Sequence, residues 1–205
     1  MNPPVQMGYS RQNDAGGVRQ DDCLMQIDAT GCARGIRFIA SPNFDERPGG
    51  CAISLLVIHN ISLPPDQFGG NGVAELFTNE LDPEAHPYYR TIHGLRVSSH
   101  FYIPRTGEVI QFVPCEKRAW HAGESCWQGR SRCNDFSIGI ELEGSDSQPF
   151  TDSQYRMLVG LTLELQKAYP IEHIAGHSDI APGRKTDPGP CFDWKRYRTA
   201  LAASR

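Results

Sequence analysis

Short apolar segments bounded by turn-forming residues predict a series of buried strands. Residues 53–59 (ISLLVIH) are rich in branched aliphatic side chains and run into a proline-rich turn. Residues 98–104 and 108–113 flank Arg-Thr-Gly, a connection typical of a hairpin. Residues 137–142 (SIGIEL) and 171–176 (IEHIAG) complete the series.

Three stretches predict helices. The strongest covers residues 151–168, where three leucines recur three and four positions apart, a threonine or an aspartate can cap the start, and a proline follows the end. Residues 73–78 and 193–203 predict two shorter helices. Strands separated by helices and long loops indicate an α/β (α+β) domain with a central mixed β-sheet flanked by helices.

Length and composition indicate one domain and exclude some partners. The 205 residues suit a single domain, with residues 1–22 as a flexible N-terminal tail and residues 23–205 as the globular part. A formal net charge of -4 excludes a polybasic nucleic-acid binder. The longest apolar stretch, residues 53–58, is far shorter than the ~20 residues of a membrane span.

The N-terminus and the cysteines indicate the compartment. We read no secretory signal at the N-terminus, so the cytoplasm is the expected location. The seven cysteines are an odd number with no C-x2-C pair, which suits free thiols in a reducing compartment. The oligomeric state stays open, with a monomer favoured.

Two histidines and an aspartate can form a metal site. His59 and His177 each end a predicted strand and open a loop, and Asp187 lies ten residues after His177 in the same loop. Side chains at strand ends can converge on a common rim. Two imidazoles and a carboxylate leave one coordination position open, as in catalytic zinc sites. There is no HExxH signature, so ordinary hydrogen-bonding roles for the histidines remain an alternative.

A glutamate and a lysine are candidates for proton transfer and charge stabilisation. Residues 138–143 alternate between apolar and other side chains, which puts Glu141 and Glu143 on one face of the strand. That face is either solvated or directs Glu141 into a cleft as a general base. Lys185, two residues before Asp187, is either an exposed loop lysine or an ammonium that stabilises a developing oxyanion.

Five motifs, in order along the chain, resemble a known enzyme family. They are HNISLPP (59–65), RVSSHF (96–101), KRAWHAG (117–123), RCNDFSIGIELEG (132–144) and GHSDIAPGRKTDPGP (176–190). Together they resemble the AmpD-type zinc amidases of bacterial cell-wall recycling, the 1,6-anhydro-N-acetylmuramyl-L-alanine amidases. That type belongs to a superfamily with peptidoglycan-recognition proteins and phage lysozyme-like amidases. The resemblance runs from about residue 36 to residue 198 and leaves the tail outside it.

The resemblance implies a peptidoglycan-recognition-protein-like amidase fold, with residues 23–205 as a zinc amidase catalytic domain. It implies that His59, His177 and Asp187 hold Zn2+. Glu141 would be the catalytic acid and base, and Lys185 its electrostatic partner at the reacting carbonyl. Many superfamily relatives have a cysteine as the third ligand; Asp187 matches the AmpD type.

The resemblance also implies a substrate and the residues that bind it. The substrate would be a small cytoplasmic muropeptide, cleaved between anhydro-N-acetylmuramic acid and L-alanine of its stem peptide, with no nucleic acid or membrane involved. Asn60, Arg96 and Arg132 would hold it, and Trp120 and His121 would line the groove. Two alternatives stay open: a non-catalytic peptidoglycan-binding module, and an exported N-acetylmuramoyl-L-alanine amidase acting on polymeric wall.

Overall fold

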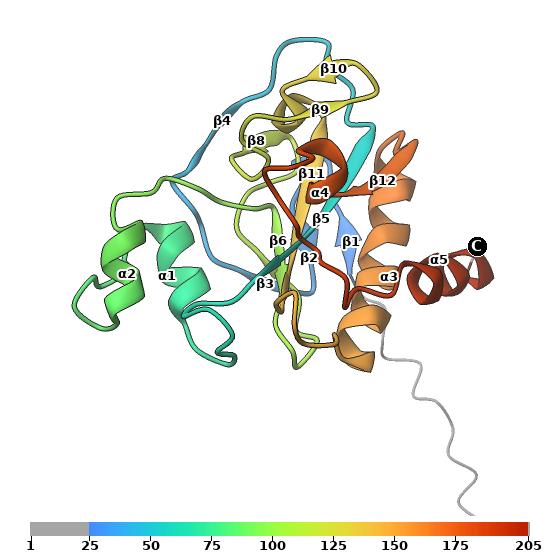
Figure 1. The fold of residues 1–205 in the computed structure, drawn as a ribbon. Helices are drawn as coiled ribbons and strands as arrows, with labels where there is room; N and C mark the ends of the chain where they lie inside the picture. The colour runs from blue at the N-terminus through green and yellow to red at the C-terminus, as the bar shows by residue number, and fades with distance from the viewer. Residues whose placement is uncertain (1–24, 205) are drawn as a thin grey trace, which may run out of the picture.

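The computed structural model describes residues 25–204, which form a mixed β-sheet with helices against both of its faces (Figure 1). The fold class predicted from the sequence is therefore confirmed. The predicted tail, residues 1–22, lies outside the described residues.

The main sheet has six strands in the order β12-β5-β11-β6-β7-β3. β12, β5, β11 and β6 run parallel, β7 is antiparallel to β6, and β3 is parallel to β7. The bounds are β3 Arg37–Phe38, β5 Leu55–Ile61, β6 Phe101–Ile103, β7 Ile110–Gln111, β11 Ser137–Glu143 and β12 His173–Gly176. β5 and β11 are paired over seven residues and form the centre of the sheet.

Smaller elements surround this sheet. Three two-stranded sheets consist of β1 Gln26–Ile27 with β2 Ala33–Arg34, β4 Phe44–Glu46 with β8 Lys117–Ala119, and β9 Cys126–Trp127 with β10 Arg130–Ser131. The helices are α1 Gly72–Thr78, α2 Pro87–Ile92, the 3-10 helix η1 Cys133–Asp135, α3 Asp152–Ala168, α4 His177–Ile180 and α5 Trp194–Ala203.

The long helix α3 covers one face of the sheet. Its fully buried leucines, Leu158, Leu161 and Leu165, pack in one core with apolar side chains of β5 and β11. Thr151 caps the helix by accepting a hydrogen bond from the backbone of Gln154, whose side chain accepts one from Thr151 in return. Such a cap is worth ~1 kcal/mol. The opposite face of the sheet carries α1 and α2, which pack over a second core that includes Tyr102 and Phe112.

Sequence and structure differ most where tertiary contacts decide the conformation. The predicted strand 108–113 shortens to β7, because its partner β3 is only two residues long. The buried side chain of Gln111, at the end of β7, forms hydrogen bonds with the backbone of Gly31, Ala33 and Val113. Helix α2, which starts at Pro87 and is capped by the ring nitrogen of His86, was not predicted from the sequence.

Two further expectations concern membranes and cysteines. Within residues 25–204 even the longest helix, α3, lacks the length and apolar character of a membrane span. The six described cysteines are all free thiols, as the sequence predicted for them.

Candidate active site

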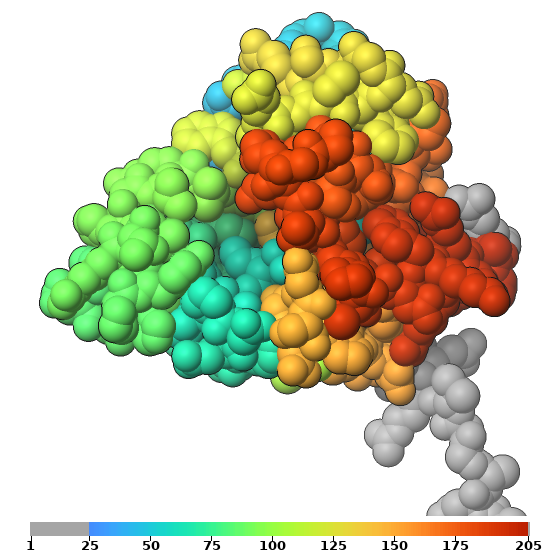
Figure 2. Space-filling model, viewed as in Figure 1, coloured from blue at the N-terminus to red at the C-terminus, as the bar shows by residue number. Residues whose placement is uncertain are grey.

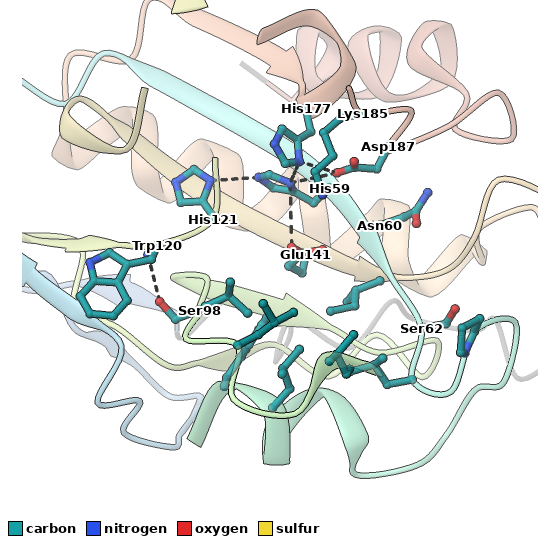
Figure 3. Close-up of a pocket in the computed structure, with 18 of the residues that line it drawn as sticks. His59, Asn60, Ser62, Ser98, Trp120, His121, Glu141, His177, Lys185 and Asp187 are labelled. Atoms are coloured by element: carbon teal, nitrogen blue, oxygen red, sulfur yellow. Dashed lines mark hydrogen bonds and ion pairs between the residues drawn. The ribbon is translucent and has the colours of Figure 1, made fainter. Parts of the chain in front are cut away.

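A cavity of about 370 Å³ opens at the carboxyl ends of β5 and β11. In the space-filling view it lies in the hollow between the green α2 segment and the red C-terminal loops (Figure 2). One wall is polar and is formed by His59, Glu141, His177, Lys185 and Asp187, most of which gather at the top of the close-up (Figure 3).

The polar wall brings together the two histidines and the aspartate. The Nδ1 atoms of His59 and His177 lie 3.0 Å apart, and each lies 3.0 Å from Oδ2 of Asp187. The topology explains this, because β12 pairs in parallel with β5 and ends at Gly176, opposite Ile58. His177 therefore begins α4 beside His59. The loop after α4 returns to the same point, where Ser178 donates a backbone hydrogen bond to the carbonyl of Asp187.

These three atoms suit a divalent cation. Nε2 of His177 lies 3.1 Å from the carbonyl oxygen of Ala122, which can only accept, so Nε2 holds the proton of the neutral ring and Nδ1 presents a lone pair. Burial lowers the pKa of His59 to about 4 and favours its neutral form. Burial raises the pKa of Asp187, but the closely placed rings of His177 and His59 outweigh it and hold that pKa below its ordinary value.

The donor set also has the right spacing for zinc. Ligands bound tetrahedrally to zinc stand about 3.3–3.5 Å apart, so an ion would spread the three atoms only slightly. Two neutral imidazoles and one carboxylate are ligands that zinc commonly takes. The described residues of the chain contain this group of potential metal ligands at β5, α4 and the loop that follows it.

Glu141 lies next to this group. Its Oε1 is 3.9 Å from Nδ1 of His59, and within residues 25–204 no group forms a hydrogen bond with its buried Oε2. Burial, and then the negative charge of Asp187, raise the pKa of Glu141 well above its ordinary value, while Lys185 acts in the opposite direction. The solvated-face interpretation of Glu141 is therefore wrong. The carboxyl group points into the cavity, with the exposed Lys185 across from it.

Glu143 lies on the same face of β11 but serves a different purpose. It is 3% exposed, and its carboxylate accepts hydrogen bonds from the backbone N–H groups of Gly69 and Arg105. It thereby joins two loops, one of which continues from the cavity wall at Leu63 and Pro65. The solvated-face interpretation fails for this residue also.

We predict that Glu143→Gln lowers the free energy of unfolding by about 1–3 kcal/mol, because the amide can accept from only one of the two backbone donors and leaves the other unpaired. Denaturant unfolding measures the loss. Glu108→Gln, at an exposed glutamate nearby, is the control and should leave stability unchanged. Equal stability of both variants would contradict a joining role for Glu143.

The predicted substrate residues occupy two kinds of position. Asn60, Trp120 and His121 line the cavity, and Asn60 donates a hydrogen bond to Asp146. Arg96 and Arg132 are both exposed and outside the lining of the cavity.

Both arginines lie in loops between secondary-structure elements. Arg96 lies between Leu95 and Val97, which do line it. Arg132 lies before η1, with its Nε 3.3 Å from Oδ2 of Asp135. Neither guanidinium group can contact a ligand that stays within the cavity.

The cavity wall opposite the metal ligands was not predicted from the sequence. This apolar wall comes from α1, α2 and their flanking loops, and consists of Leu63, Leu76, Phe77, Tyr88, Ile92, Leu95 and Val97. The sequence pattern that could have predicted this wall was weak. Helix α2 has few apolar residues, and the apolar residues of the loops lack the regular spacing of an amphipathic helix. The His-Pro pair that starts α2 was the available clue.

Comparison with known proteins bears on the chemistry of this cavity. A family model described as N-acetylmuramoyl-L-alanine amidase matches residues 49–190, which hold both histidines, Glu141 and Asp187. The chain belongs to this family. It is therefore an amidase, a hydrolase of peptidoglycan recycling and catabolism, and the alternative of a non-catalytic binding module is set aside.

The amidase has close relatives of the AmpD type. It is 55% identical over 170 residues to the 1,6-anhydro-N-acetylmuramyl-L-alanine amidase AmpD of Escherichia coli K12, a match that covers 82% of this chain and 93% of the relative. A crystal structure of a selenomethionine derivative of AmpD superposes with a TM-score of 0.84 at 54% identity and covers 86% of this chain and 99% of that one. The resemblance to the AmpD type is confirmed.

A more distant relative was solved with a substrate. The N-acetylmuramyl-L-alanine amidase AmiD of Escherichia coli, in complex with anhydro-N-acetylmuramic acid-L-Ala-D-γ-Glu-L-Lys, matches at 30% identity with a TM-score of 0.54. The match covers 77% of this chain and 65% of that chain.

Proposed function

We propose that this amidase uses zinc to hydrolyse the amide bond between anhydro-N-acetylmuramic acid and L-alanine in small cytoplasmic muropeptides. The observation that carries the proposal is the convergence of His59, His177 and Asp187 beside a carboxyl oxygen of Glu141 that has no hydrogen-bond partner among residues 25–204. The names of the AmpD relatives and the ligand of the AmiD complex support the choice of bond.

The three ligands hold the ion on one side of the cavity. When bound, zinc supplies a Lewis acid that polarises the scissile carbonyl and makes water more acidic. His59, His177 and Asp187 would fix its position at the polar wall of the cavity.

Glu141 moves the proton in both halves of the reaction. Its carboxylate accepts a proton from the attacking water, and its raised pKa then lets it hold the proton until the amine departs. The acid form donates that proton to the leaving nitrogen of L-alanine. The ammonium of Lys185 stabilises the negative charge that develops on the carbonyl oxygen.

A comparison of two substrates tests the proposal. Mass spectrometry should detect release of stem peptide from soluble anhydro-muropeptide, and chelation should stop it. Intact sacculi should be cleaved far more slowly. Faster cleavage of sacculi than of the soluble compound would favour the alternative, an amidase that acts on polymeric wall.

We further propose that Asn60 and Trp120 contact the part of the muropeptide inside the cavity, and that Arg96 and Arg132 bind stem-peptide carboxylates that extend beyond it. An arginine grips a carboxylate through two parallel hydrogen bonds that lysine cannot reproduce. A hydrogen bond to a charged group contributes ~1.5–3 kcal/mol.

Arg96→Lys and Arg132→Lys should therefore each lower kcat/KM for soluble anhydro-muropeptide about tenfold or more. Zinc content and thermal stability should stay unchanged. Arg90→Lys, at an exposed arginine of α2 paired with Glu84, is the matched control and should have no effect. Unaltered kcat/KM in both variants would leave Arg96 and Arg132 as surface residues.

A further inference from the structure

The two histidines of the metal site direct their outer ring nitrogens at consecutive residues. Nε2 of His177 lies 3.1 Å from the carbonyl oxygen of Ala122. Nε2 of His59 lies 3.0 Å from Nδ1 of His121 (Figure 3). One histidine is thus oriented by a backbone carbonyl and the other by an imidazole side chain.

The hydrogen-bond directions along this chain of rings follow from the metal-facing atoms. Nδ1 of His59 faces Oδ2 of Asp187 and Nδ1 of His177, both of which present lone pairs. A neutral His59 whose Nδ1 offers a lone pair to a metal ion carries its proton on Nε2. This N–H group donates a hydrogen bond to Nδ1 of His121. His121 then carries its own proton on Nε2, which lies 3.2 Å from Oγ of Ser137. Oγ of Ser137 accepts the hydrogen bond from this N–H group.

The ring of His121 is fixed in place by its surroundings. A Cβ atom added at Gly139 would lie 2.5 Å from Cγ of His121, so β11 leaves a slot for the imidazole at that position. The backbone N–H groups of His121 and Ala122 both donate to Oδ1 of Asn134, at 3.2 and 2.8 Å. The residue is only 9% exposed.

We propose that His121 is a positioning residue. Its Nδ1 accepts a hydrogen bond from the Nε2–H group of His59 and so fixes the orientation of the His59 ring that presents Nδ1 of His59 to zinc. The inference rests on the proposed zinc site and adds a role for His121 to its place in the cavity lining. Outer partners of metal-bound histidines are usually carboxylates, backbone carbonyls or water, and losing one typically costs 10–100-fold in metal affinity. Unlike a carboxylate, an imidazole acceptor adds no negative charge to the site.

A pair of nearly isosteric substitutions separates this role from simple packing. The side-chain oxygen of asparagine reaches the position of a histidine Nδ1 and accepts a hydrogen bond, whereas leucine fills similar space without an acceptor. His121→Leu should raise the dissociation constant for Zn2+ by roughly 10–100-fold in chelator competition. His121→Asn should stay close to the wild type, and the absorption spectrum of the Co2+-substituted protein should change in the leucine variant only.

Two further variants complete the experiment. Trp120→Leu, at the adjacent cavity-lining residue, is the control and should bind Zn2+ as tightly as the wild type. Ser137→Ala removes the acceptor for His121 and should weaken Zn2+ binding less than His121→Leu does. It also keeps the proposal testable if His121→Leu does not fold, because an unchanged affinity in Ser137→Ala would then overturn it.

The possible failures can be told apart. If the wild type binds Zn2+ no better than His59→Ala, the zinc site itself is wrong and the proposed function fails with it. If the wild type binds Zn2+ tightly and His121→Leu binds it equally well while its KM for muropeptide rises, His121 contacts substrate and the positioning role is overturned.

Discussion

Replacing His59, His177 or Asp187 with alanine should reduce hydrolysis of anhydro-muropeptide to background. Each change removes one of three donor atoms that stand 3.0 Å apart, and two remaining ligands hold zinc poorly. Elemental analysis should find little zinc in the variants, and mass spectrometry should find no released peptide. Chelation of the wild type should have the same effect, and added zinc should restore activity.

Cys191→Ser is the control for these substitutions. Cys191 lies four residues after Asp187 and is a weak competitor for the metal. Its Sγ instead lies 3.2 Å from the backbone oxygen of Asp146, to which it donates. The variant should keep both zinc and activity. Full activity in protein shown by elemental analysis to be metal-free would refute the zinc mechanism.

Glu141→Gln should lower kcat about 100- to 10,000-fold, the usual contribution of general acid–base catalysis, while zinc stays bound. The amide keeps the shape of the side chain but cannot accept the proton of the attacking water. Zinc content, thermal stability and kcat are measured on the same preparation. A loss of less than about threefold with full zinc occupancy would mean that another group transfers the proton.

Glu143 provides the internal comparison, since it is also buried and on the same face of β11. Its carboxylate is already occupied by the backbone of Gly69 and Arg105. Below its melting temperature, Glu143→Gln should therefore lose much less turnover than Glu141→Gln. The two glutamates separate a loss of chemistry from a loss of stability.

Local patterns predicted the centre of this fold well. β5, β11, β12 and α3 each have an apolar pattern complete within one segment, and their positions agree with the sequence analysis to within about two residues. The proximity of His59 and His177 was also predictable from these strand patterns, because both residues lie toward the carboxyl ends of parallel strands.

Other features depend on partners remote in the sequence. The burial of Glu143 requires two loops to offer backbone N–H groups at one point, which no pattern in residues 137–143 reveals. The position of His121 next to His59 depends on Gly139, because any residue with a Cβ atom there would collide with the His121 ring. The exposed positions of Arg96 and Arg132 depend on loop paths for which the chain has no periodic signal.

The apolar wall of the cavity has a thermodynamic consequence. Tyr88 is 37% exposed and Leu95 is 49% exposed, so part of this wall remains in contact with water. A ligand that covers it removes apolar surface from solvent, and such burial gives a negative change in heat capacity on binding. Calorimetric titrations of the Glu141→Gln protein with muropeptide, at several temperatures, should therefore show a binding enthalpy that becomes more favourable as the temperature rises. Substituting Leu95 with serine should flatten that slope, since less apolar surface is then left for the ligand to cover.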